Sequence, residues 1–282
     1  KSNPNAMRTL RANSIYTNCA LAPDGDVWWE DMTDELPTTL TSWKREKWTP
    51  GCGTKAAHPN ARYTTPACQC PVIDPAWEDP AGVPISAILF GGRRPSTVPL
   101  CFEAPTWQYA TFLGSIQASE TTAAAAGSVG VLRYDPMAML PFCGYNMGDY
   151  FTHWLSMPSR VPNAKMPRAF YVNWFRLSDD GRWLWPGFGE NSRVLKWIFE
   201  RVEGTAQAVE SPIGLLPAPG AIDTNGLKVD AEDMQELLSV DTQAWLKDLP
   251  AIRAHYAKFG EAIPAVLQKE LDALEARLKA AK

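Results

Sequence analysis

The sequence predicts a globular protein that combines β-strands with α-helices. Its 282 residues are 45% hydrophobic and 11% aromatic, which is enough to bury a large core. Short runs of apolar, β-branched and aromatic residues between turn-forming residues predict strands through the first two thirds of the chain. Amphipathic repeats after residue 231 predict a helical C-terminal part. The length fits either two domains or one large domain with appendages.

The first strands are predicted around the turn Pro23–Asp26. β-branched and aromatic residues over 9–20 and 27–30 flank this turn, which favours a hairpin. Residues 31–82 are rich in Pro, Gly, Cys and Thr without sustained periodicity, so they predict a long ordered loop region. The apolar run 83–90 predicts a buried strand that stops at a glycine pair.

The middle of the chain contains further predicted elements and one segment that is open to two interpretations. Residues 119–128 are small and uncharged past Glu120, so they either continue a helix or form a linker, or they form a mobile lid over a ligand. Asn191 or Ser192 is expected to cap the helix that follows. Spacing and turn residues predict helices over 107–118, 148–157 and 193–202, a strand over 169–176, and a hairpin that joins this strand to 182–185.

The last part of the chain has the pattern of amphipathic helices. Three helices are predicted, over 231–238, 242–259 and 263–282. Their apolar positions predict packing against the core rather than a ligand site. The clearest stripe alternates intervals of four and three residues: Leu267, Leu271, Leu274 and Leu278.

Charge and composition exclude several classes of function. The net charge of -4 is too acidic for a dedicated binder of nucleic acid or anionic membranes. No apolar run approaches the ~20 residues that a membrane-spanning helix needs. The three histidines lie far apart, and Cys68-Gln69-Cys70 lacks the spacing of a redox or zinc pair, so no metal site is expected in this chain. Dispersed cysteines without a secretory segment predict a reduced, cytoplasmic protein. Because the chain starts at Lys1, we expect it to be part of a longer protein.

An aromatic cluster surrounds a glycine-rich turn. The segment 187–192 matches a dinucleotide fingerprint only weakly, because a serine stands where the third glycine belongs. Glycines let a backbone approach a flat ligand, and aromatic faces stack purines, so the cluster favours a purine pocket. An aromatic corner of the core is the alternative. The cluster consists of Trp174, Phe175, Trp183, Trp185 and Phe188.

Two basic segments lie in irregular parts of the chain. Asn60-Ala61-Arg62 lies in a loop region, and Arg93-Arg94 follows a predicted strand. Guanidinium groups bind carboxylate or phosphate oxygens at two points, so these loops are candidates for an anion site. Ordinary surface charge is the alternative. The sequence contains no GxxxxGKS or GxxxxGKT motif, so a phosphate-cradling loop is not expected in this chain.

Several sequence blocks occur together in a fixed order. They are Asn3-Pro4-Asn5-Ala6-Met7, His58-Pro59-Asn60-Ala61-Arg62, Phe90-Gly91-Gly92-Arg93-Arg94-Pro95 with Val98-Pro99-Leu100, Asp135-Pro136-Met137-Ala138-Met139, Pro141-Phe142-Cys143-Gly144-Tyr145-Asn146, His153-Trp154-Leu155-Ser156-Met157, Val172-Asn173-Trp174-Phe175-Arg176 and Leu184-Trp185-Pro186-Gly187-Phe188-Gly189-Glu190-Asn191-Ser192-Arg193. Together these blocks resemble the GTP-dependent phosphoenolpyruvate carboxykinase family, across residues 1 to about 240.

This resemblance implies an enzyme of gluconeogenesis that interconverts oxaloacetate and GTP with phosphoenolpyruvate, carbon dioxide and GDP. It also implies Mn²⁺, and Mg²⁺ with the nucleotide, as metal cofactors. Decarboxylation generates an enolate that attacks the γ-phosphoryl group, and preorganised cations stabilise the negative charge of both steps. The implied fold is a mixed α/β nucleotide-binding domain over 1–282, with helices on a twisted mixed sheet and C-terminal helices over 231–282.

By motif position, five residues resemble the family's substrate and phosphate contacts. Asn60, Ala61 and Arg62 resemble the substrate loop, and Phe142 resembles the aromatic edge beside the substrate. Arg62 and Arg93 resemble catalytic arginines that also contact the nucleotide. Arg93 is expected to neutralise the phosphoryl group during its transfer.

The same correspondence implies a guanine pocket. Its stretch from Phe188 to Asn191 resembles the part that reads the base, and a carboxamide suits this role because it offers both a donor and an acceptor. Many relatives have Phe where this chain has Trp183. The residues that resemble nucleotide contacts are Trp174, Phe175, Trp183, Phe188, Gly189, Glu190 and Asn191.

Residues 119–131 resemble the lid of the family, which closes over the bound ligands. Glu120, Thr122, Ala124 and Gly127 lie in this segment. The segment carries fewer charges than the lid of many members, and closure is expected to be retained.

The family's phosphate loop, its reactive cysteine and its Lys, His and Asp metal ligands are expected in a part that precedes this chain. We therefore expect the chain to be about the C-terminal half of the enzyme and inactive by itself. The alternative is a non-catalytic guanine-nucleotide-binding or interaction module. The family is usually monomeric, but an exposed sheet edge would make this half prone to self-association or dependent on its N-terminal half.

Overall fold

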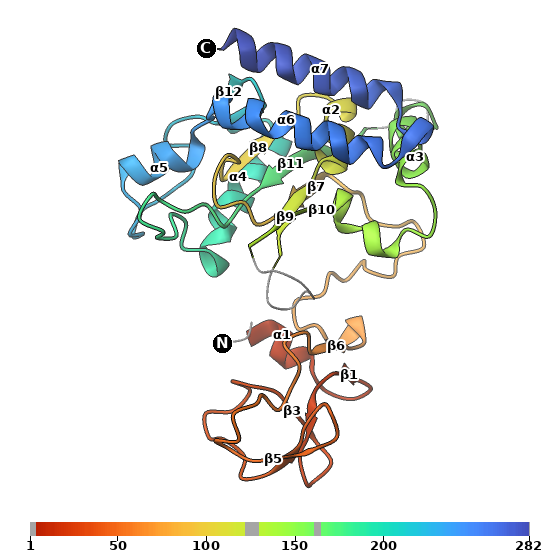
Figure 1. Ribbon diagram of the computed structural model, residues 1–282, viewed down its shortest axis with the longest axis vertical. Coiled ribbons are helices and arrows are strands. Elements are labelled where there is room, and N and C mark those ends of the chain that lie inside the picture. The colour runs from red at the N-terminus through yellow and green to blue at the C-terminus, as the bar shows by residue number, and fades with distance from the viewer. Residues whose placement is uncertain (1–3, 122–129, 161–164, 282) are drawn as a thin grey trace. The chain divides into compact units, whose positions relative to one another are not determined.

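The computed structural model describes residues 4–121, 130–160 and 165–281. These residues fall into two compact units (Figure 1). The N-terminal unit contains the described residues up to Pro84. The C-terminal unit contains Ile85–Thr121 and the described residues from Gly130 onward.

The N-terminal unit holds two small antiparallel sheets. One sheet has four strands in the order β3-β2-β4-β5, and the other pairs β1 with β6. The elements of this unit are α1 (Pro4–Thr9), β1 (Ile15–Thr17), β2 (Ala20–Leu21), β3 (Val27–Trp28), β4 (Leu40–Thr41), β5 (Lys47–Trp48), β6 (Arg62–Thr64) and the 3₁₀ helix η1 (Ala67–Gln69).

Two hairpins of the four-stranded sheet are built alike. In β2–β3, Ala20 lies opposite Trp28, and in β4–β5, Leu40 lies opposite Trp48. The two indole rings lie 5.8 Å apart between centroids and are both buried. They form the centre of the small core of this unit.

The predicted hairpin around Pro23–Asp26 is confirmed, although each of its strands is only two residues long. Gly25 has φ 90°, a left-handed conformation that suits glycine in such a turn. The long loop region predicted for 31–82 is confirmed, since β4, β5, β6 and η1 are only two or three residues long each. β6 pairs with β1 and β4 pairs with β2, strands that are distant in sequence, whereas β5 pairs with the neighbouring β4. Helix α1 was not predicted.

The C-terminal unit is built around a five-stranded mixed sheet in the order β12-β13-β8-β11-β7. β11 is parallel to β7 and antiparallel to β8, which confirms the expected mixed sheet. The strands are β7 (Ala87–Gly91), β8 (Cys101–Glu103), β11 (Arg168–Val172), β12 (Ala208–Ser211) and β13 (Gly214–Pro217). The predicted buried strand 83–90 therefore starts later, and as an edge strand it leaves Leu89 exposed.

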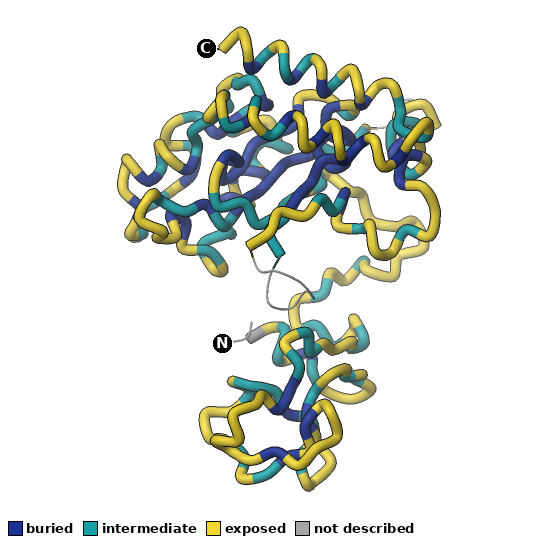
Figure 2. Tube along the Cα trace, viewed as in Figure 1, coloured by how far each residue is buried: buried dark blue, intermediate teal, exposed yellow. Residues whose placement is uncertain are grey.

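Strand β11 explains why this sheet needs cover on both faces. Ala169 and Tyr171 belong to one hydrophobic cluster, and Phe170 and Val172 belong to another. Because successive side chains of a strand point to opposite faces, an uninterrupted apolar run buries both. Figure 2 shows the sheet as buried segments inside this unit. The predicted strand 169–176 ends at Val172, where the chain turns into the loop that follows.

Helices cover each face of the sheet (Figure 1). The first cluster includes residues of α2, α3, α6 and α7, and the second includes residues of α4 and α5. The helices are α2 (Trp107–Ser115), α3 (Met147–Arg160), α4 (Asn191–Glu203), α5 (Ala231–Leu238), α6 (Thr242–Ala257) and α7 (Ala265–Ala280), with 3₁₀ turns η2 (Pro136–Ala138), η3 (Leu140–Phe142), η4 (Phe188–Glu190) and η5 (Gly260–Ala262).

The C-terminal helices confirm the sequence analysis closely. The carboxylates of Asp230 and Asp241 accept hydrogen bonds from backbone N–H groups and cap α5 and α6. The second helix ends two residues before the predicted Phe259, and the third begins at Ala265 rather than at 263. The leucine stripe of α7 is fully buried in the first cluster, as predicted.

A short hairpin corrects two predictions for the middle of the chain. The helix predicted over 107–118 ends at Ser115, and residues 118–120 form strand β9, paired with β10 (Leu132–Tyr134). Continuation of the helix is therefore wrong at 118–120. Helix α3 is longer than the predicted 148–157. No helix in the described part of the chain is both long and apolar enough to cross a membrane.

Candidate functional site

The aromatic cluster of the C-terminal unit begins where β11 ends. Phe175 and Trp183 are in contact, with centroids 5.8 Å apart and ring planes at 75°. An isolated bridge between Leu177 and Trp183 closes the intervening turn, so the predicted second hairpin is present as a single bridge. The indole of Trp183 is 54% exposed. It therefore offers a stacking surface at the end of the sheet.

The turn that carries Trp183 is tied to helix α5. Both terminal nitrogens of Arg182 donate to the carboxylate of Asp233, at 2.8 and 3.2 Å. The hydrogen bonds from Arg182 hold the pKa of Asp233 below its usual value. Ser178 donates to Asp180 and lowers the pKa of that carboxyl as well. The ion pair with α5 and the hydrogen bond within the turn therefore hold the turn in place.

The other aromatic residues divide between the core and the surface. Trp185 is 1% exposed and belongs to the second cluster, and Trp174 packs against that cluster. Phe188 is 70% exposed. The aromatic-corner interpretation therefore holds for Trp185, whereas Trp183 and Phe188 expose their rings, and for them the purine pocket stays a prediction.

The glycine-rich stretch has an unusual backbone. Gly187 has φ 76°, and Phe188 has φ 32°, a conformation that costs energy for a residue with a side chain. The stretch leads into η4 and then into α4, whose first residue is Asn191. The prediction that Asn191 or Ser192 is the N-cap is wrong, because Glu190 occupies that position. The Asn191 carboxamide instead accepts a hydrogen bond from the indole N–H of Trp185 at 2.9 Å.

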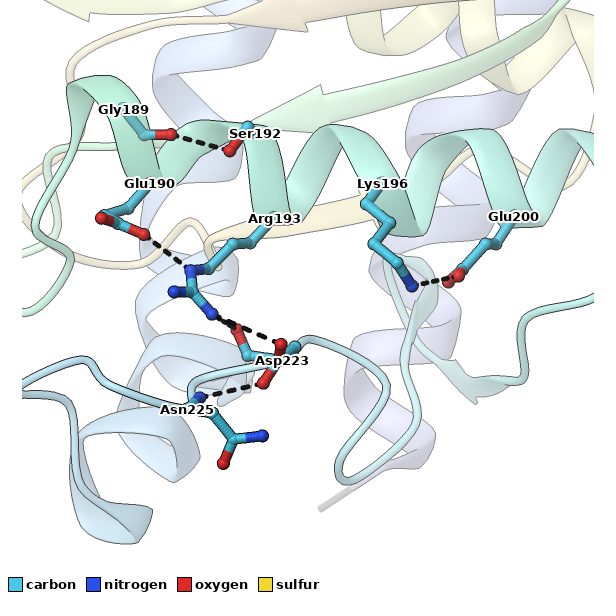
Figure 3. Close-up of polar contacts among 8 residues, drawn as sticks. All are labelled: Gly189, Glu190, Ser192, Arg193, Lys196, Glu200, Asp223 and Asn225. Carbon is cyan, nitrogen blue, oxygen red and sulfur yellow. Dashed lines mark hydrogen bonds and ion pairs between the residues drawn. The ribbon is translucent and has the colours of Figure 1, made fainter.

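Arg193 anchors this stretch to a neighbouring loop (Figure 3). Its Nε donates to Glu190 at 2.6 Å, and its Nη1 donates to the backbone carbonyl of Asp223 at 2.9 Å. The hydroxyl of Ser192 donates to the carbonyl of Gly189 at 2.7 Å. The first turn of α4 is therefore held from two sides.

Arg93 lies beside Phe175. Its guanidinium carbon is 3.9 Å from the centroid of the Phe175 ring, a cation–π contact. The Arg93 backbone is paired with β9, because its N–H donates to Ser119 Oγ at 3.0 Å and its carbonyl accepts from the Glu120 N–H at 3.0 Å. Among the described residues, no carboxylate forms an ion pair with Arg93.

Gly92 allows this approach of the two segments. A Cβ at Gly92 would lie 2.2 Å from the carbonyl oxygen of Ala118, which is closer than any side chain permits. The absence of a side chain therefore lets the arginine loop lie against β9.

Arg94 has a structural role instead. Its Nη2 forms an ion pair with Asp248 of α6 at 2.5 Å. The fully buried Asn173 binds the Arg94 backbone, because its Nδ2 donates to the Arg94 carbonyl at 2.7 Å and its Oδ1 accepts from the Arg94 N–H at 3.3 Å. The same Oδ1 accepts from the N–H of Phe175 at 3.2 Å. Asn173 thus joins the arginine loop to the aromatic segment.

Sequence reasoning singled out neither Asn173 nor Ser119 as a contributor to the site. One signal was available for Asn173, since it is a polar residue directly after an apolar strand and before two aromatic residues. A cavity of about 680 Å³ in the C-terminal unit was also missed. It is lined by residues between Val209 and Ser239, including Leu216, Met234 and Leu238.

The substrate loop predicted from the sequence belongs to the N-terminal unit. Arg62 lies on β6, and its Nε donates to Asn60 Oδ1 at 2.8 Å. The Asn60 N–H donates to His58 Nδ1 at 2.9 Å, and its carbonyl accepts from Asn18 at 3.3 Å. Ala61 and Arg62 line a cavity of about 330 Å³, together with Ala6, Met7, Tyr16, Cys19, Trp29 and Tyr63.

The remaining predicted residues belong to the C-terminal unit or lie outside the described part of the chain. Phe142 ends η3 and is 82% exposed. Glu120 is the last residue of β9. Thr122, Ala124 and Gly127 lie outside the described residues. Within the described part of the chain, no group of three or more His, Cys, Asp or Glu side chains could hold a metal ion.

Comparison with known proteins gives one consistent family. Residues 1–277 match a family model described as the phosphoenolpyruvate carboxykinase C-terminal P-loop domain. Three relatives, each named phosphoenolpyruvate carboxykinase [GTP], are 54% identical over 286 residues (Neocallimastix frontalis), 51% over 278 (Paenarthrobacter aurescens) and 50% over 280 (Chlamydia felis). The alignments cover 98 to 100% of this chain and 46 to 47% of each relative, so the chain spans about half the length of the curated relatives that it matches.

Proposed function

Because this chain belongs to the GTP-dependent phosphoenolpyruvate carboxykinase family and matches its C-terminal domain, we propose that it supplies the guanine-nucleotide site and the substrate arginines of that enzyme. The reaction is the conversion of oxaloacetate and GTP to phosphoenolpyruvate, carbon dioxide and GDP, as in gluconeogenesis. The proposal depends on the environment of Arg93. Its guanidinium forms no ion pair among the described residues and lies against the ring of Phe175, which belongs to the aromatic cluster.

Arg93 is proposed to bind the phosphates. Its backbone is fixed on β9 by two hydrogen bonds, while its guanidinium lies over the ring of Phe175 and forms no ion pair within the described part of the chain. A positioned cation stabilises the charge that develops on a transferring phosphoryl group without reorganising in the reaction. Arg93 therefore acts as a catalytic residue in this proposal.

The aromatic cluster is proposed to bind the guanine base. Trp183 and Phe188 expose their rings, and Phe175 lies between Trp183 and Arg93. Base stacking on an aromatic ring is worth about 1–3 kcal/mol. Trp174 supports the pocket from the core side, and the stretch from Phe188 through Gly189 and Glu190 to Asn191 lies next to the base.

The N-terminal unit is proposed to contribute substrate contacts. Asn60 accepts from the Nε of Arg62, and within the described residues the terminal nitrogens of Arg62 form no hydrogen bond, so they are proposed to bind a carboxylate or phosphoryl oxygen. Ala61 lines the same cavity as Arg62, and Asn60 precedes it in the chain, so both are proposed as substrate contacts. Phe142, whose ring is exposed, is separately proposed as a substrate contact of the C-terminal unit. Residues 119–131 are proposed to form the lid.

The family implies divalent metal ions, Mn²⁺ and Mg²⁺, but the described residues of this chain do not form a site for them. We propose that the chain by itself binds guanine nucleotide without catalysing the reaction. Oxaloacetate or phosphoenolpyruvate and a guanine nucleotide are its proposed ligands, and the cytoplasm is its proposed location.

Titration of intrinsic tryptophan fluorescence with GDP and with ADP tests this proposal, since Trp174, Trp183 and Trp185 report on the pocket. We expect saturable quenching by GDP and much weaker quenching by ADP. Arg93→Ala should weaken GDP binding, whereas Arg160→Ala, an exposed change on α3, should not. The absence of any saturable response to GDP, or turnover of oxaloacetate by the chain alone, would contradict the proposal.

A further inference from the structure

Trp185, a buried residue, and Asn191, a half-buried one, form a hydrogen bond at the edge of the proposed base pocket. The indole Nε1 of Trp185 donates to the Oδ1 of Asn191 at 2.9 Å. Resting on the proposed guanine-nucleotide site, we infer that Trp185 is a positioning residue that sets base preference by fixing the orientation of the Asn191 carboxamide.

The chemistry of an indole decides the orientation of the amide. An indole nitrogen carries one N–H and cannot accept a hydrogen bond. A carboxamide has an acceptor oxygen and a donor nitrogen, and a flip of the group exchanges them. Because only the oxygen of the Asn191 carboxamide can face the indole N–H, the Nδ2 of Asn191 must point away from Trp185. Among the described residues, that Nδ2 has no hydrogen-bond partner.

Neither partner is free to reorient. Trp185 is 1% exposed and packs in the second hydrophobic cluster, beside Leu184 and Val194. Asn191 is the first residue of α4, and two residues later Arg193 ties that turn to Glu190 and to the loop at Asp223 (Figure 3). The Nδ2 of Asn191 is therefore a fixed donor.

A fixed donor distinguishes purines at their 6-position. Guanine and hypoxanthine carry a carbonyl oxygen there, which accepts from an N–H, whereas adenine carries an amino group, which is itself a donor. Two donors that face each other leave both groups without a partner, and such a mismatch lowers affinity. The site should therefore bind 6-oxopurine nucleotides, with or without the 2-amino group, more tightly than 6-aminopurine nucleotides.

Binding of GDP, IDP and ADP to the 282-residue chain, measured by calorimetry, tests this inference. The wild-type chain should bind GDP and IDP with similar affinity and ADP much more weakly. Trp185→Phe frees the amide to turn either way, so the ratio of GDP affinity to ADP affinity should fall by about tenfold. Trp197→Phe is the matched control, because Trp197 is equally buried and its indole donates to the carbonyl of Gln207, away from the base pocket. It should leave the ratio unchanged.

A second variant keeps the test decisive if Trp185→Phe does not fold. Asn191→Asp retains an acceptor for the indole and removes the donor, so it should lower GDP affinity more than ADP affinity. In ¹H–¹⁵N spectra without ligand, Asn191→Ala should remove the hydrogen-exchange protection of the Trp185 indole and spare that of Trp197.

The outcomes separate the two proposals. If the wild-type chain binds none of the three nucleotides, the proposed function fails and this inference fails with it. If the wild-type chain binds GDP but rejects IDP as strongly as ADP, recognition does not act at the 6-position and only the inference is overturned. The same holds if Trp185→Phe or Asn191→Asp keeps the wild-type ratio of affinities, or if the Trp185 indole keeps its protection in Asn191→Ala.

Discussion

The guanidinium of Arg93 lies over the ring of Phe175, 3.9 Å from its centroid. Arg93 follows β7 and Phe175 follows β11, two strands that are parallel neighbours. The carboxyl ends of neighbouring parallel strands are a common place for ligands in α/β sheets. In this protein they place the proposed phosphate and base contacts next to each other.

Phe175→Leu should weaken GDP binding. The substitution keeps an apolar side chain but removes the aromatic face that contacts both Arg93 and Trp183. Loss of one stacking face costs about 1–3 kcal/mol, so the dissociation constant should rise about 5-fold to 150-fold. Calorimetric titration measures it. Phe199→Leu, at an exposed ring on α4, is the control, and equal affinities of the two variants would contradict the prediction.

Asn173→Ala should destabilise the C-terminal unit strongly. The fully buried carboxamide donates to the carbonyls of Arg94 and Val98 and accepts from two backbone N–H groups. Its removal leaves several buried groups unpaired, each at a cost of about 1–3 kcal/mol. Urea denaturation should show a loss of at least about 3 kcal/mol. Thr111→Val, which removes one hydrogen bond inside α2, should lose about 1 kcal/mol, and equal losses would speak against the bridging role of Asn173.

Gly92→Ala should disturb the contact between the arginine loop and β9. The added Cβ would lie 2.2 Å from the Ala118 carbonyl oxygen, so the backbone must shift. Such overpacking costs about 1–3 kcal/mol, and GDP affinity should fall with it because the backbone of Arg93 moves. Gly144→Ala is the control, since its Cβ would meet nothing within 4 Å. A Gly92→Ala chain with wild-type unfolding free energy would refute the close approach.

Stability should fall in mild acid because of His255. Burial lowers its pKa from 6.5 to about 4, and the ring is enclosed by Tyr134, Phe259 and the carbonyl of Ser115. The unfolded chain takes up a proton near pH 6.5 while the folded chain does not, so acid favours unfolding between pH 6.5 and about 4.

Urea denaturation at pH 7 and pH 4.5 measures this effect. The His255 contribution should be about 2–3 kcal/mol less favourable at the lower pH. In His255→Gln this part of the pH dependence should disappear. His153→Gln, an exposed histidine on α3, should behave like the wild-type chain, and a pH dependence that persists in His255→Gln would show that another group is responsible.

The sequence was sufficient to predict elements whose signals are local. Helices α5, α6 and α7 follow their apolar periodicity and caps to within a few residues. Strand β9 was not predictable in this way, because it depends on pairing with β10, across a segment of more than ten residues. Propensity alone extends helix α2 over it, and the ladder overrides that preference.

In the candidate site, too, local features could be predicted from the sequence and tertiary contacts could not. The aromatic cluster was visible from composition, but the sequence does not show that Trp185 is buried and Trp183 exposed, since both are tryptophans two residues apart. Residues two apart on an extended segment share a face, so the separation of the two rings reflects the bend of the chain at Leu184 and Trp185 rather than strand alternation. Asn191 was expected as an N-cap because Asn favours that position. The indole of Trp185 binds its carboxamide instead, a tertiary contact that no local pattern reports.

The paired hairpins of the N-terminal unit bear on how fast this part of the chain can fold. Trp28 lies opposite Ala20 and Trp48 lies opposite Leu40, so each ladder closes a loop of fewer than ten residues. Contacts that are close in sequence form quickly, and an isolated hairpin forms in about 1–10 μs. The two indoles then need only to meet across β2 and β4. The parallel pair β7–β11 joins strands that are separated by about 80 residues of sequence, so it should form more slowly. We therefore expect the four-stranded sheet to form before β7 pairs with β11.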